Sequence, residues 1–174
     1  MKHSLNPLKA ILLAAVLVVP QLGSAQTILP NPSNDEVRAP RPARARGIPT
    51  ALAIEAAQAA NASCLAAGSK TTTVVIDSEG IPIVMISDDG AAAITQRIAM
   101  GKAMIALETR HPSADGATAD AAVMAPLGVG RPGGFPLMAG ADLMGALAVS
   151  GSPNGQADEV CAKAAITKVQ ARVK

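Results

Sequence analysis

Residues 71–87 read TTTVVIDSEGIPIVMIS, a pattern typical of two short strands joined by a tight turn. β-Branched residues dominate Thr71–Asp77 and Ile81–Ser87, and the turn formers 78–80 stand between the two runs. The sequence therefore predicts a β-hairpin. Because proline has no backbone N–H, Pro82 predicts that the second strand lies at a sheet edge or contains a bulge.

Helical periodicity flanks this hairpin on both sides. Residues 50–68 begin at Thr50, a residue type that caps helices, and end at Gly68, which tolerates the left-handed conformation. One face of this helix is predicted to carry Ala53, Ala57, Ala60 and Cys64. A second helix is predicted over Thr95–Glu108, with Pro112 as its stop signal and with Ile98, Lys102, Ile105 and Ala106 on one face.

The last third of the chain predicts a second hairpin and a final helix. A short helix is expected over Ala117–Met124, and the glycine-rich residues 128–134 are expected to form a loop. Strands are expected over Phe135–Met138 and Leu143–Ser150. The final helix, over Gln156–Arg172, is predicted to carry Ala157, Cys161, Ala164 and Ala165 on one face, with Asp158 and Glu159 near its positive end. This order of elements predicts an α+β domain with one antiparallel sheet and packed helices.

Two cysteines occur in the chain, Cys64 and Cys161. In an oxidising compartment a pair of cysteines is first interpreted as a disulfide, whereas two buried, unreactive thiols are the alternative. If the first and last helices of the domain are neighbours, the two side chains can meet.

The N-terminus has the organisation of a secretory signal. Lys2 and Lys9 form a basic start, residues 10–19 are apolar, and Gly23-Ser24-Ala25 is a small-residue cleavage site. We therefore expect residues 1–25 to be a signal peptide. The mature protein is expected to be periplasmic or secreted and to have no membrane attachment after cleavage. The proline- and arginine-rich residues 26–48 are predicted to be a disordered linker, and residues 49–174 a single domain.

Charge gives no support for nucleic-acid binding. Two of the 15 basic residues lie in the predicted signal, so the remaining ones match the 13 acidic residues in number. Phe135 is the only aromatic residue, so the arginines of residues 38–46 have no aromatic neighbours that could stack on bases.

Several short motifs occur in a fixed order along the chain. They are Val75-Ile76-Asp77-Ser78-Glu79-Gly80, Asp89-Gly90-Ala91, Ile98-Ala99 with Lys102-Ala103, Gly133-Gly134-Phe135-Pro136 and Val149-Ser150-Gly151. In this order they resemble the GlcG/HbpS family of haem-binding proteins, and the resemblance extends over residues 50–173. It implies a profilin-like α+β domain that assembles into homo-oligomers and, as in several members, binds haem.

The resemblance also implies site residues. The family often has Pro-Thr after the Lys-Ala helix, with the threonine at the haem site in some members, and Pro112-Ser113 is the matching pair here. His111 precedes it and is the only histidine outside the predicted signal, so it is the candidate ligand of the haem iron. A solvated histidine beside the negative end of a helix is the alternative. Arg97 and Lys102 are candidate partners of the haem propionates, or else ordinary exposed helix charges.

No catalytic constellation is visible in the chain. The glycines of residues 128–133 match a dinucleotide-binding string, but a proline and a strand follow where a helix is required. We therefore expect an exported haem-binding protein, an accessory in haem storage or sensing, rather than an enzyme. Two alternatives stay open, namely an accessory domain that binds a small organic ligand without haem, and an enzyme that degrades haem or acts on a small metabolite.

Overall fold

The computed structural model describes residues 45–118, 121–125 and 130–174. The predicted signal peptide and all but the end of the predicted linker lie outside the described residues. The described elements, in chain order, are α2 (Thr50–Ala66), β1 (Thr72–Ile76), β2 (Pro82–Ser87), α3 (Ile94–Thr109), a 3-10 helix (Ser113–Thr118), α4 (Ala121–Met124), β3 (Gly134–Ala139), β4 (Asp142–Ser150), α5 (Gly155–Val169) and a final 3-10 turn (Gln170–Arg172).

The four strands form one antiparallel sheet in the order β2-β1-β4-β3. Both predicted hairpins are confirmed, and β1 and β4 pair with each other at the centre. Pro82 begins an edge strand, and the register between β1 and β2 shifts between Val75 and Ile76. An edge position with a local bulge is where a residue without a backbone N–H is tolerated.

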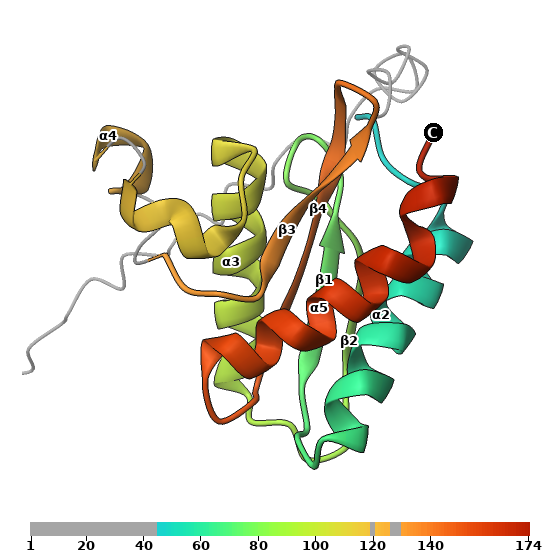
Figure 1. The fold of residues 1–174 in the computed structure, drawn as a ribbon, viewed down its shortest axis with the longest axis vertical. Coiled ribbons are helices and arrows are strands. Elements are labelled where there is room, and N and C mark those ends of the chain that lie inside the picture. The colour runs from blue at the N-terminus through green and yellow to red at the C-terminus, as the bar shows by residue number, and fades with distance from the viewer. Residues whose placement is uncertain (1–44, 119–120, 126–129) are drawn as a thin grey trace, which may run out of the picture. The chain divides into compact units, whose positions relative to one another are not determined.

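Helices cover both faces of the sheet, as Figure 1 shows. Leu147 and Val149 of β4 belong to a core cluster with α2 and α5, whereas Ala146 and Ala148 belong to a second cluster with α3. This alternation is the period of two that a strand buried on both faces requires. The predicted α+β domain with an antiparallel sheet and packed helices is confirmed.

Three local predictions need correction. The residue before helix α2 is Pro49, whose extended backbone precedes the first turn, so Thr50 lies inside the helix and no side chain caps this end. The predicted helix over Ala117–Met124 is instead a 3-10 helix followed by the single turn α4, with residues 119–120 outside the described part. In α5, Ala164 is exposed and Ala162 is buried, because the helix turns Asp158 inward.

Alanine brings α2 and α5 close together. Ala53, Ala56, Ala57 and Ala60 of α2 are fully buried, and so are Ala162 and Ala165 of α5. The small side chains leave room for a disulfide between Cys64 and Cys161, whose Cα atoms are 5.4 Å apart and whose positions are 97 residues apart in sequence.

Among the described residues, no helix is long and apolar enough to cross a membrane.

The disulfide closes a long loop, so its loss is expected to be costly. In the chain-entropy model a loop of this size contributes up to about 4.7 kcal/mol, and removal of native disulfides costs about 2–5 kcal/mol. We predict a loss in this range for the double variant Cys64→Ala, Cys161→Ala, measured by urea unfolding. Reduction of the wild-type protein should give the same loss, and equal stability of oxidised and reduced protein would contradict this assignment.

Candidate functional site

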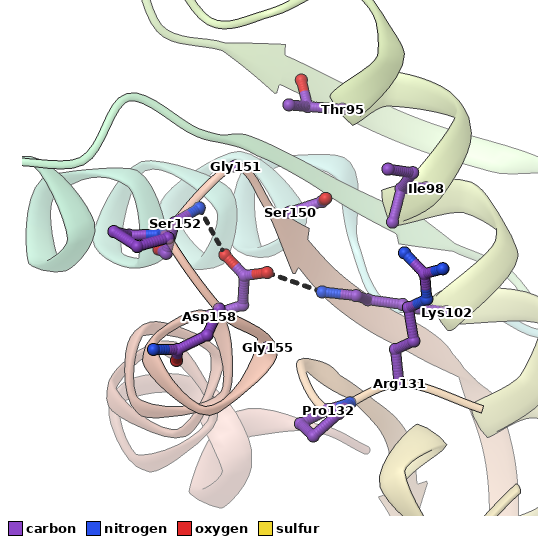
Figure 2. Close-up of a pocket in the computed structure, with 12 residues that line it drawn as sticks. Thr95, Ile98, Lys102, Arg131, Pro132, Ser150, Gly151, Ser152, Gly155 and Asp158 are labelled. Atoms are coloured by element: carbon purple, nitrogen blue, oxygen red, sulfur yellow. Dashed lines mark hydrogen bonds and ion pairs between the residues drawn. The ribbon is translucent and has the colours of Figure 1, made fainter. Parts of the chain in front are cut away.

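Two adjoining hollows lie beside α3 and share Ile98, Lys102 and Arg131. The apolar hollow has a volume of about 340 Å³ and is lined in addition by Ile94, Arg97, Gly101 and Ile105. The polar hollow, drawn in Figure 2, has a volume of about 270 Å³ and is lined in addition by Thr95, Pro132, Ser150, Gly151, Ser152, Pro153, Asn154, Gly155 and Asp158. The wall shared by the two hollows is therefore cationic.

A buried ion pair lies at the base of the polar hollow. The Lys102 ammonium donates to Asp158 Oδ2 at 2.6 Å and to the Val149 carbonyl at 2.9 Å, and both charged side chains are only 4% exposed. The other carboxylate oxygen of Asp158 accepts the Ser152 amide at 2.8 Å, as Figure 2 shows. The pair joins α3 to the end of β4 and to the first turns of α5.

Burial is the main influence on the titration of Lys102. Desolvation lowers the pKa of its ammonium below the ordinary value, the hydrogen bond and charge of Asp158 oppose that effect, and the charge of Arg131 adds to it. The Lys102 charge is balanced by Asp158, so it adds no net charge to the hollows.

Two glycines close the chain over this ion pair. A Cβ on Gly133, which has a φ of 118°, would lie 2.9 Å from the Asp158 Cβ and 3.0 Å from Lys102 Nζ. A Cβ on Gly134 would lie 2.6 Å from the Lys102 carbonyl oxygen. The Gly-Gly motif noted in the sequence is thus required by close backbone approach to α3 and α5.

Ser113 fixes the same segment from the other side. Its side chain is fully buried, its hydroxyl donates to the Arg131 carbonyl at 2.6 Å, and it accepts the Gly134 amide at 2.8 Å. Ser113 therefore positions residues 131–134 and does not line either hollow. Lys102 lines both hollows, but its charge is already committed to Asp158.

The structure separates the remaining predicted site residues. Arg97 lines the apolar hollow in the first turns of α3. His111 is exposed beyond the other end of this helix and lines neither hollow. From Arg97 to Thr109, the last residue of α3, the helix axis rises by about 18 Å.

Three contributors to the site were not identified as such from the sequence. Arg131 stands in a glycine-rich segment that is predicted to be a loop. Asp158 is typical of an acidic residue at a helix start, and Ser150 lies in a predicted strand. No group of three or more potential metal-ligating His, Cys, Asp or Glu side chains occurs among the residues that the structure describes.

Comparison with protein-family models matches residues 48–167 to the family described as "Haem degrading protein HbpS-like". The chain belongs to the HbpS-like family. No curated protein matches its sequence.

Solved structures agree with the fold of this HbpS-like chain. A double mutant of HbpS from Streptomyces reticuli is 25% identical, with a TM-score of 0.66 over 73% of this chain and 90% of that one. The Klebsiella pneumoniae protein ORFY is 19% identical, with a TM-score of 0.64 over 72% of this chain and 92% of that one. A complex of PduOC with haem is 18% identical, with a TM-score of 0.62 over 70% and 94% of the two chains. The last two likenesses establish the fold alone.

The buried ion pair should be far more important for stability than a surface pair. Removing one partner, as in Lys102→Met, leaves Asp158 buried without a counter-charge, and we predict a loss of about 3–5 kcal/mol. Adding Asp158→Leu should recover part of that loss, because no isolated charge then remains. The free energy of unfolding of each variant is to be measured by denaturant unfolding.

An exposed ion pair within α5, the helix that carries Asp158, provides the matched control. Lys163 and Glu159 are also 2.6 Å apart, but their side chains are 60% and 22% exposed. Lys163→Met should therefore cost less than about 1 kcal/mol. Equal losses for Lys102→Met and Lys163→Met would refute a special role for the buried pair.

Proposed function

We propose that this HbpS-like chain is an exported haem-binding protein. The observation that carries the proposal is the apolar hollow, where isoleucines of α3 adjoin two arginines that have no carboxylate partner among the described residues. Haem has an apolar ring edge and two propionate carboxylates, so this combination of surfaces fits it. Membership of the HbpS-like family supports the same ligand.

The two propionates would pair with Arg97 and Arg131. Both guanidinium groups border the apolar hollow, and a planar guanidinium can form two parallel hydrogen bonds with one carboxylate. Ile94, Ile98 and Ile105 would contact the porphyrin ring. In this proposal Lys102 and Ser113 do not contact haem directly. Lys102 pairs with Asp158, and Ser113 holds the backbone of the segment that carries Arg131.

His111 remains our proposed ligand for the iron. The side chains that line the hollows include no histidine, methionine, cysteine or tyrosine. The apolar hollow ends near Ile105, about one helical turn before Thr109. His111 is exposed just beyond that point, so its imidazole is free to turn toward the ring.

Export is supported by the disulfide and by the N-terminal pattern. Disulfides such as the one between Cys64 and Cys161 are typical of proteins that fold in an oxidising compartment. If residues 1–25 are removed during export, the mature protein begins at Gln26, and N-terminal sequencing of the exported chain tests that start.

A hemin titration of the mature chain, followed in the Soret region, tests the ligand. We predict saturable, stoichiometric binding, weakened about tenfold by Arg97→Gln or by Arg131→Gln, since each removes a charge-assisted hydrogen bond. Arg110→Gln, an exposed arginine outside both hollows, is the matched control and should bind hemin as the wild type does. His111→Ala should shift the position of the Soret band, because the iron loses an imidazole.

The outcomes separate the site residues from the function. Binding that is saturable but equal in all variants would discard the proposed residues and keep haem as the ligand. Non-saturable partitioning would refute haem binding. Loss of the Soret band with release of iron after a reductant is added would assign haem degradation in place of binding alone.

A further inference from the structure

The polar hollow contains a serine hydroxyl that has no partner among the described residues. Ser150, the last residue of β4, is only 4% exposed, and its hydroxyl makes no hydrogen bond to another described residue. Every completely buried side-chain nitrogen or oxygen among the described residues has a partner, so this hydroxyl is open to the hollow. In Figure 2 this hydroxyl points from the sheet toward α3, on the side where Ile98 and Lys102 stand. A hydroxyl can donate one hydrogen bond and accept two, so this one is available to a ligand atom in the hollow.

Unused cationic donors line the same space. An ammonium group has three N–H donors, and Lys102 uses two of them, on Val149 and Asp158. The Arg131 guanidinium has no acidic partner among the described residues, and Figure 2 draws it beside Ile98 and Lys102. The two cations and the single carboxylate of Asp158 leave one positive charge in excess.

We propose that the polar hollow binds a small organic monocarboxylate, a ligand separate from haem. Its carboxylate would pair with Arg131 and accept hydrogen bonds from the Ser150 hydroxyl and the third N–H of Lys102. A short alkyl chain would lie against Ile98 and Pro132, which line the same hollow. A single negative charge matches the excess charge of the hollow, and a volume of about 270 Å³ suits a molecule of a few heavy atoms.

An NMR titration of the ¹⁵N-labelled mature chain tests this site. Acetate and butyrate are added separately at constant ionic strength, and each should cause saturable shifts of the Ser150 and Gly151 amides, with butyrate binding the tighter. Ser150→Ala should weaken butyrate binding about fivefold, as expected for one lost hydrogen bond, and Arg131→Gln at least about tenfold. Ser78→Ala, a serine in the β1–β2 turn that lines neither hollow, is the matched control and should have no effect.

Two of these variants, each tested with the other ligand, keep this proposal distinct from haem binding. Ser150→Ala should retain hemin affinity, and Arg97→Gln should retain butyrate affinity, because each residue lines only one of the hollows. Shifts that chloride reproduces at the same ionic strength, or butyrate binding equal in Ser150→Ala, Arg131→Gln and wild type, would overturn the site. Tighter binding of inorganic phosphate than of any carboxylate would overturn the ligand class.

Discussion

The contact between the Lys102 ammonium and the Asp158 carboxylate organises the site. Its partners come from α3 and α5, and the Val149 carbonyl adds the end of β4, so one buried charge pair joins three elements. In a low-dielectric interior neither charge is tolerated alone. The pair therefore requires that Asp158 of α5 face α3, and it explains why residue 133, which lies against both side chains, is a glycine.

The same pair determines the charge that a ligand meets. Because Asp158 balances Lys102, the positive charge of the two hollows belongs to Arg97 and Arg131, which have no acidic partner among the described residues. Ser113 holds the Arg131 segment through its hydroxyl without touching the hollows. The site thus combines a rigid base, formed by buried polar contacts, with a cationic wall available to carboxylate groups.

Sequence patterns predicted the helices and strands but not the contact between Lys102 and Asp158, because such patterns report only on residues that are close in sequence. The hairpins, the main helices and the buried face of α2 depend on neighbours a few residues away, so periodicity and turn residues identify them. Lys102 and Asp158 are 56 positions apart, and each alone is typical of an exposed helix charge. The resemblance to a family identified the segment around Ser113, but only the fold shows that this hydroxyl bonds to the backbone of the Gly-Gly loop.

The most direct test of the organising role of the ion pair is amide hydrogen exchange in the Lys102→Met variant. The account predicts that the amides of Ser152 and Gly134, which donate to Asp158 and to Ser113, exchange faster than in the wild type. The central β1 amides, such as that of Val74, should keep their protection. Unchanged exchange at Ser152 and Gly134, or a uniform loss of protection across the sheet, would contradict the account.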